Sequence, residues 1–258
     1  MLWEGGIDMK SSFLNREKAT LTSMVQAETP ERIRELMDNS LRDGAEAFGM
    51  QFCRLLPEYR TASVYRELFS YAKDKPVYVT NYRQVNNEGK SDDTLAEELL
   101  GIADCGPTLC DVMGDFFDKQ PDELAVDPIA IKKQKELIAN LHQKGVEVLM
   151  SSHIFKFTPA ERVLEIALAH KERGADISKI VTDAENMEQQ IENLRIINLL
   201  KEKLGIPFLF LCGGECSILR KIGGEVGCCM YLGVYEHDEL ATPVQPLIKS
   251  IKAVRDNI

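Results

Sequence analysis

The chain has 258 residues, of which 44% are hydrophobic and 28% are charged, a composition typical of a soluble globular protein. Its net charge of −10 comes from 31 basic and 41 acidic residues and would repel a polyanion, so we expect no nucleic acid partner. The N-terminus lacks the basic flank and apolar core of a signal peptide, and no apolar run is long enough to cross a bilayer. These features predict a cytoplasmic protein that does not bind a membrane.

The seven cysteines have an odd count and no repeating spacing, so they do not form a disulfide framework and we expect reduced thiols. Cys212 and Cys216 form an isolated pair and Cys228 and Cys229 are adjacent, and neither pair has the spacing of a zinc site. The neighbouring glycines at 213–214 lack the lysine of a phosphate-binding loop. The sequence therefore predicts neither a metal nor a cofactor.

Short β-branched or apolar runs alternate with longer helical patterns from residue 19 onward. In some of the helical patterns, apolar residues recur three and four positions apart, as in Ile33, Leu36, Met37 and Leu41, which is the spacing of a helix that buries one face. Eight of the short runs are predicted strands, at residues 19–26, 47–53, 76–80, 108–113, 147–151, 177–182, 207–212 and 228–232.

Strand and helix alternating in this way predict parallel strands joined by right-handed crossovers. We therefore expect an α/β fold, a single (β/α)8 TIM barrel domain over residues 1–258, which is a normal length for this fold. Residues 1–17 are expected to form an N-terminal arm or a hairpin that closes the barrel bottom. A doubly wound open sheet is the alternative that the same alternation allows.

In such a barrel the working residues lie at the C-terminal ends of the strands. Lys179 stands among apolar residues in the sixth predicted strand, where burial would lower the pKa of its amine and favour attack on a carbonyl. His153 ends the fifth strand, where a histidine can act as a general base, and Arg220 follows the glycine loop, where it can hold a carboxylate. Each residue alone also allows a plainer interpretation: a strand-end lysine reaching solvent, a structural histidine, a surface arginine.

Together these residues resemble those of type I 3-dehydroquinate dehydratases. Residues 148–159, with His153, are similar to that family's Met-Ser-x-His-x-Phe-x-x-Thr-Pro signature, and residues 175–180, with Lys179, to its Ala-Asp-x-x-Lys segment. Residues 216–225, with Arg220, resemble its Ser-Arg helix, and residues 242–245 resemble the Ala-Pro-Gly-Gln loop that folds over the substrate.

The resemblance implies a β-elimination that converts 3-dehydroquinate to 3-dehydroshikimate, a step of the shikimate pathway to aromatic amino acids, without a cofactor. Lys179 would form an imine with a carboxylated cyclic ketone, and His153 would move protons. Arg220 would bind the substrate carboxylate and Gln245 would close the lid. The resemblance further implies a homodimer. It also assigns substrate-binding positions to Arg83, Glu88, Ser23 and Gln51.

The second and fourth strands depart from the family pattern. The family's Glu-x-Arg-x-Asp, whose first two charged groups serve the substrate hydroxyls, becomes Gln51-Phe52-Cys53-Arg54-Leu55. Its Asp-x-Glu becomes Asp111-Val112-Met113, and the serine of the lid loop becomes Ala241. We therefore expect the pocket end away from Arg220 to be less charged, unless a bulge swings Arg54 inward.

Three hypotheses follow from these observations. The chain is a divergent 3-dehydroquinate dehydratase, or an imine-forming lyase or aldolase-like enzyme acting on another oxo acid or keto-sugar, or a paralogue that binds without catalysis. Borohydride trapping with substrate separates the first two from the third, and turnover of dehydroquinate separates the first from the second.

Overall fold

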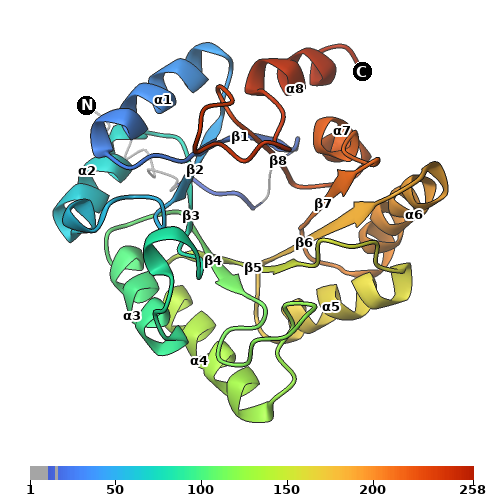
Figure 1. The fold of residues 1–258 in the computed structure, drawn as a ribbon, viewed down its shortest axis with the longest axis horizontal. Coiled ribbons are helices and arrows are strands. Elements are labelled where there is room, and N and C mark those ends of the chain that lie inside the picture. The colour runs from blue at the N-terminus through green and yellow to red at the C-terminus, as the bar shows by residue number, and fades with distance from the viewer. Residues whose placement is uncertain (1–10, 15–16) are drawn as a thin grey trace, which may run out of the picture.

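The structure, a computed structural model, describes residues 11–14 and 17–258, and it alternates strands with helices throughout (Figure 1). The strands are β1 Thr20–Val25, β2 Ala47–Gln51, β3 Val77–Thr80, β4 Leu109–Met113, β5 Glu147–His153, β6 Ile177–Ala184, β7 Phe208–Gly214 and β8 Met230–Gly233. The α-helices are α1 Pro30–Arg42, α2 Ala62–Tyr71, α3 Asp92–Ala103, α4 Pro128–Gln143, α5 Ala160–Glu172, α6 Met187–Lys203, α7 Leu219–Val226 and α8 Ile248–Arg255. Two short 3-10 helices, η1 Pro57–Tyr59 and η2 Val85–Asn87, follow β2 and β3.

The strands form one parallel sheet of eight in the order β7-β6-β5-β4-β3-β2-β1-β8. A backbone hydrogen bond of 2.8 Å from Cys229 N to Phe208 O links the start of β8 to that of β7, so the barrel is nearly closed. The helices surround the strands as an outer ring (Figure 1). The predicted TIM barrel is confirmed, as are all eight strands to within two residues. The open sheet is wrong because the strand order never reverses at a switch point.

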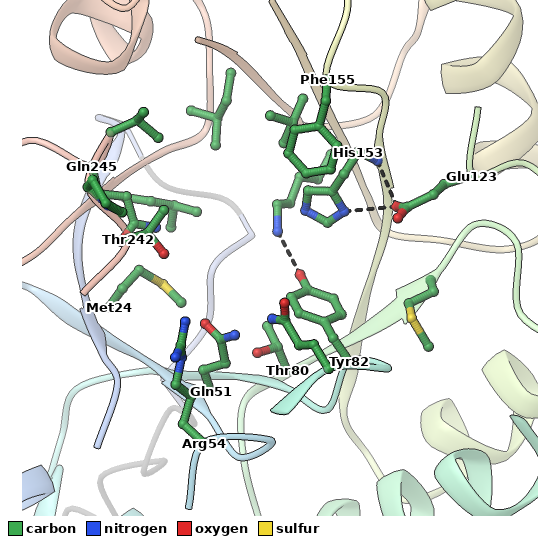
Figure 2. A pocket seen from close by; sticks show the side chains of 18 of the residues that line it. Met24, Gln51, Arg54, Thr80, Tyr82, Glu123, His153, Phe155, Thr242 and Gln245 are labelled. Atoms are coloured by element: carbon green, nitrogen blue, oxygen red, sulfur yellow. Dashed lines mark hydrogen bonds and ion pairs between the residues drawn. The ribbon is translucent and has the colours of Figure 1, made fainter. Parts of the chain in front are cut away.

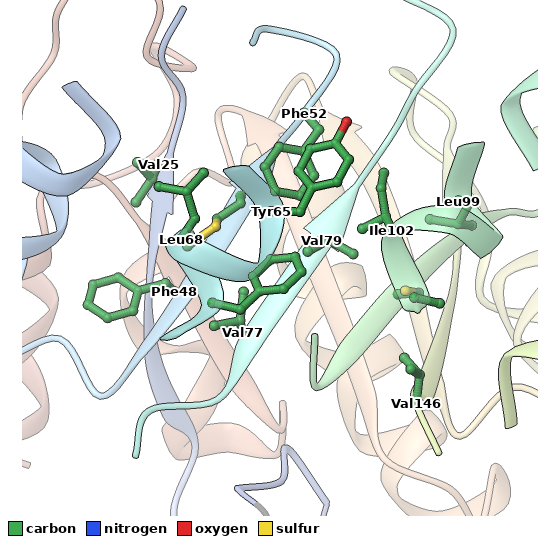
Figure 3. Close-up of a cluster of buried hydrophobic side chains, with 14 of the residues drawn as sticks. Val25, Phe48, Phe52, Tyr65, Leu68, Val77, Val79, Leu99, Ile102 and Val146 are labelled. Carbon is green, nitrogen blue, oxygen red and sulfur yellow. The ribbon is translucent and has the colours of Figure 1, made fainter. Parts of the chain in front are cut away.

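The strands are buried on both faces, since the barrel interior covers one and the helices cover the other. On α5, Val163, Ile166 and Ala167 are fully buried at the spacing expected for a helix that covers a sheet. Leu68 of α2 belongs to a buried cluster with Phe48 and Val77 of the strands (Figure 3). Burial of each such large side chain stabilises the fold by about 1.5–3 kcal/mol.

Residues 11–14 lie at the amino ends of the strands. Phe13 is 2% exposed and clusters with Leu109 and Leu149, and its backbone N–H donates to Glu147 at 3.0 Å. The rest of the arm or hairpin predicted for residues 1–17 lies mostly outside the described residues. We infer that the chain forms one barrel domain. Within the described ranges, no helix combines the length and the apolar character needed to cross a membrane.

Candidate active site

A cavity of about 490 Å³ opens at the carboxyl ends of the strands. Its wall contains Lys179 of β6, His153 of β5 and Arg220 of α7, so the structure brings the three main sequence candidates together. Figure 2 shows this cavity with Gln51 and Arg54 on the side opposite His153 and Phe155. Such a position is where barrel enzymes place their chemistry.

Lys179 is 5% exposed, and its amine lies among three polar groups. Its Nζ is 2.8 Å from the Tyr82 hydroxyl, 3.1 Å from the Tyr78 hydroxyl and 3.4 Å from Asp111 Oδ2. Burial lowers the pKa of Lys179, and the nearby Asp111 carboxylate opposes that shift without cancelling it. The amine is therefore more readily neutral than that of an exposed lysine.

The two tyrosines orient the amine. Both hydroxyls donate to Asp111 Oδ2, and Ser151 donates to Asp111 Oδ1 at 2.6 Å. Burial, followed by the Asp111 charge, raises the pKa of Tyr78 and Tyr82 well above the usual value, so both hydroxyls keep their protons. A neutral amine then donates its two hydrogens to the two tyrosine oxygens. Its lone pair is left free to attack a carbonyl in the cavity.

His153 is held by a carboxylate. Its Nδ1 is 2.9 Å from Glu123 Oε2, and its backbone N–H donates to the same oxygen at 2.7 Å (Figure 2). The ring meets Tyr82 edge-on at 5.4 Å between centroids and stacks on Phe155 at 6.1 Å. Because Nδ1 is engaged, Nε2 is the ring nitrogen left for a ligand.

The loop that carries Glu123 is anchored by a buried polar network. Ser152 donates to the Glu123 carbonyl at 2.6 Å, and Arg173 donates to the carbonyls of Gly114 and Ala125 at 2.8 and 2.6 Å. These bonds satisfy buried carbonyls that would otherwise destabilise the fold. They also fix the position from which Glu123 reaches His153.

The burial of His170, on helix α5, predicts that the fold loses stability in acid. It is fully buried between Ser152 and Ser178, at 3.0 and 2.9 Å, and burial lowers its pKa from 6.5 to about 3. Below pH 6.5 the His170 imidazole binds a proton more tightly in the unfolded chain than in the folded one. The contribution of His170 to the free energy of unfolding is therefore fully present above pH 6.5 and is lost as pH falls toward 3. This shift accounts for about 2 kcal/mol between pH 6.5 and 5.

Urea unfolding at pH 7 and pH 5 tests this expectation. His170→Gln is expected to lose less free energy of unfolding between the two pH values than the unmodified chain does. His142→Gln, at a more exposed helical position, is the control and should keep the full difference. Equal losses in the His170 variant and the unmodified chain would contradict the assignment.

Arg220 and Gln245 also line the cavity, and each is 7% exposed. Arg220 donates through Nε to the Cys212 carbonyl at 2.9 Å, which fixes one nitrogen of the guanidinium. Burial lowers the pKa of Arg220, though a guanidinium stays protonated. The buried Gln245 Oε1 has no hydrogen-bond partner in the described part of the chain.

Arg54 reaches the cavity, whereas Cys53 is buried and is not part of the cavity wall. The reason is that β2 ends at Gln51 and the chain turns there, with Arg54 N donating to Gln51 O at 3.1 Å. Strand alternation therefore no longer applies to Arg54, and no bulge is needed. At this end of the pocket Gln51 and Met113 are uncharged, as expected from the sequence, whereas the Arg54 guanidinium supplies a positive charge there.

A family model of type I 3-dehydroquinase matches residues 59–257. The chain belongs to the type I 3-dehydroquinase family. The 3-dehydroquinate dehydratase of Lactiplantibacillus plantarum is 28% identical over 126 residues, which are 47% of this chain and 49% of that protein. The enzyme of the same name from Geobacillus thermodenitrificans is 26% identical over 192 residues, 73% of this chain and 70% of that protein. The match thus spans about half the length of the Lactiplantibacillus relative.

Solved structures of the same fold include several 3-dehydroquinate dehydratases. The 3-dehydroquinate dehydratase of Geobacillus kaustophilus has a TM-score of 0.78 at 15% identity and covers 93% of this chain and 91% of its own. The type I enzyme of Clostridium difficile, solved with covalently modified comenic acid, has a TM-score of 0.75 at 19% identity. The match covers 93% of this chain and 92% of that one.

Three residues that the family resemblance assigns to the substrate are either paired with other residues or outside the cavity wall. Arg83 lines the cavity, but its guanidinium pairs with Asp92 and Asp115, both at 2.6 Å. Glu88 is exposed after η2 and is not part of the cavity wall. Ser23 bonds Ser40 of α1 at 2.7 Å, because successive residues of β1 alternate faces and Met24 takes the cavity-facing place.

Four residues of this dehydroquinase-family site were not among the sequence candidates: Tyr78, Tyr82, Asp111 and Glu123. Tyr82 lies two residues after the end of β3, so the rule that strand ends carry the chemistry is sufficient to find it. Glu123 lies in the loop between β4 and α4, where no periodic pattern indicates its direction. Over residues 11–14 and 17–258, no cluster of three or more His, Cys, Asp or Glu side chains could hold a metal.

Proposed function

We propose that this family member is a Schiff-base lyase that dehydrates 3-dehydroquinate to 3-dehydroshikimate in the shikimate pathway. The observation that carries the proposal is the buried Lys179 amine, 2.8 Å from the Tyr82 hydroxyl and in the same cavity as His153. The Clostridium difficile relative, solved with a covalently modified ligand, supports covalent chemistry in this fold. We further propose a cytoplasmic location and a homodimer, as the family resemblance implies.

In this mechanism the neutral Lys179 amine attacks the ketone, and loss of water gives the imine. His153 Nε2 takes the proton from the carbon beside the imine, and the imine nitrogen receives the electron pair. The β hydroxyl then leaves as water, taking a proton from the His153 imidazolium, and hydrolysis of the imine releases the enone and restores Lys179. Arg220 holds the substrate carboxylate by paired hydrogen bonds, and Gln245 closes over the ring.

The second candidate function is the same imine chemistry on another oxo acid. It is favoured by Arg54, which forms no ion pair in the described ranges, and by Gln51 and Met113, which stand where the family has acids.

Incubation with 3-dehydroquinate and borohydride tests the proposal. We expect a reduced adduct that peptide mapping places on Lys179, together with the ultraviolet absorbance of the conjugated product when borohydride is omitted. An adduct without turnover supports the second candidate. If neither an adduct nor turnover is found with dehydroquinate or with any of the oxo acids tried, the non-catalytic hypothesis is the one that remains.

A further inference from the structure

The cavity contains two arginines that have no carboxylate partner among the described residues, Arg220 from α7 and Arg54 from the turn after β2. Arg83, by contrast, is neutralised by Asp92 and Asp115. The Arg54 Nε atom is buried and has no hydrogen-bond partner. Arg220 is buried and Arg54 is half-buried. A guanidinium partly withdrawn from water without a counterion is costly, so this arrangement indicates a ligand that brings negative charge.

Arg54 belongs to a group of three polar residues at the ends of β2 and β3, with Gln51 and Thr80, which we call the β2–β3 subsite. Gln51 and Thr80 are paired neighbours in the sheet, and they are 8% and 1% exposed. All three line the cavity, and the buried Thr80 hydroxyl also has no partner. Figure 2 shows them together, across the cavity from Phe155 and His153.

The donors of the β2–β3 subsite suit an anion better than a hydroxyl. Arg54 offers a fork of N–H groups, and Gln51 and Thr80 add an amide and a hydroxyl donor. The family's glutamate at position 51 would accept from a substrate hydroxyl, whereas the amide of Gln51 can donate to an anionic oxygen. The carboxylate in the cavity wall, Glu123, is engaged with His153.

We propose that the β2–β3 subsite binds a second anionic group, so that the preferred substrate is a ketone with one carboxylate for Arg220 and a further carboxylate or phosphate for Arg54. The inference deepens the second candidate function, imine chemistry on another oxo acid, and competes with 3-dehydroquinate as the preferred substrate. It rests on the proposed imine chemistry for what happens to the ketone, but not for the binding of the two anions. It names the substrate class: a dianionic oxo acid, favoured over one that presents hydroxyls to this end of the cavity.

Binding of two aromatic acids that cannot form an imine tests the subsite alone. Calorimetric titration should show that benzene-1,3-dicarboxylate binds at least roughly tenfold more tightly than benzoate, as expected for charge-assisted bonds to one more anion. Arg54→Gln should remove this preference and leave benzoate binding unchanged. Arg54→Lys keeps the charge without the fork and should fall between the two. Arg42→Gln, at an exposed position, is the control.

A thermal melt of each variant establishes that it is folded. Titration with 3-phosphonobenzoate in parallel with benzene-1,3-dicarboxylate shows whether the subsite prefers a phosphate-type anion or a carboxylate. The proposal is overturned if neither diacid binds more tightly than benzoate, or if the preference survives in Arg54→Gln.

Borohydride trapping of two ketones tests the proposed imine function separately from the proposed β2–β3 subsite. With borohydride, 5-oxocyclohexane-1,3-dicarboxylate should label Lys179 at lower concentration than 3-oxocyclohexanecarboxylate does. If neither ketone is trapped while the diacid preference persists, the imine function fails and the subsite stands. If both are trapped at equal concentrations and no diacid preference exists, the subsite fails and the imine function stands.

Discussion

Replacement of Lys179 by alanine is expected to abolish imine formation and to lower kcat by roughly four orders of magnitude or more, since the nucleophile itself is removed. Lys179→Arg should fail equally although it keeps a positive charge, because a guanidinium stays protonated and cannot attack a carbonyl. Mass spectrometry after borohydride treatment, together with steady-state assays, measures both effects. Lys132→Ala is the control, since its side chain is 79% exposed on α4.

A covalent adduct in either Lys179 variant would show that another amine does the work. Lys119 also lines the cavity and is the residue to map in that case. Lys179→Ala should remain folded, because removal of the buried amine also removes the cost of burying its charge. A melting temperature at or above that of the unmodified chain would therefore separate loss of chemistry from loss of structure.

The burial of Lys179 also predicts how the rate of borohydride trapping of the imine depends on pH. Because the pKa of Lys179 is lowered, a larger fraction of its amine is neutral at a given pH than in an exposed lysine. The trapping rate should therefore decline only as pH falls through the lowered pKa, which lies below the ordinary value of 10.5. A trapping rate that follows the ordinary lysine value would contradict the buried, neutral amine.

The sequence predicted the barrel well because each strand is a β-branched or apolar run buried on both faces, a pattern that does not depend on the partner strand. The ends of the strands were less predictable. The fifth predicted strand stops at residue 151, whereas β5 continues to His153, since the polar residues from Ser151 to His153 still pair with β6. Runs of apolar residues therefore locate a strand but underestimate its length where the strand enters a polar site.

The direction of each site residue depended on features that a sequence pattern does not contain. Ser23 and Met24 are equally compatible with β1, and only the register of the barrel decides that Met24 faces the cavity. Arg54 reaches the cavity because β2 ends three residues earlier, at Gln51. Glu123 depends on a loop anchored by Arg173 and Ser152, which are far away in the chain. These placements come from tertiary contacts.

The pairing of His153 with Glu123 predicts a second large effect. His153→Ala should lower kcat by about 10²–10⁴-fold with little change in KM, which is the usual contribution of a general acid–base. Glu123→Gln can keep both hydrogen bonds through its amide oxygen while losing the charge, so a smaller loss, about tenfold, is expected. Glu123→Ala should approach the loss in His153→Ala, because the imidazole is no longer held.

A double variant decides how Glu123 acts, because its side chain also lines the cavity and could touch the substrate directly. If Glu123 works by positioning His153, the combined His153→Ala, Glu123→Ala variant should be no slower than His153→Ala alone, since the residue to be positioned is already gone. If the two losses multiply in kcat, Glu123 acts on the substrate by itself, and the positioning role is refuted. Glu97→Gln, at an exposed position on α3, should leave kcat and KM unchanged and shows that the loss of one carboxylate charge is not by itself responsible.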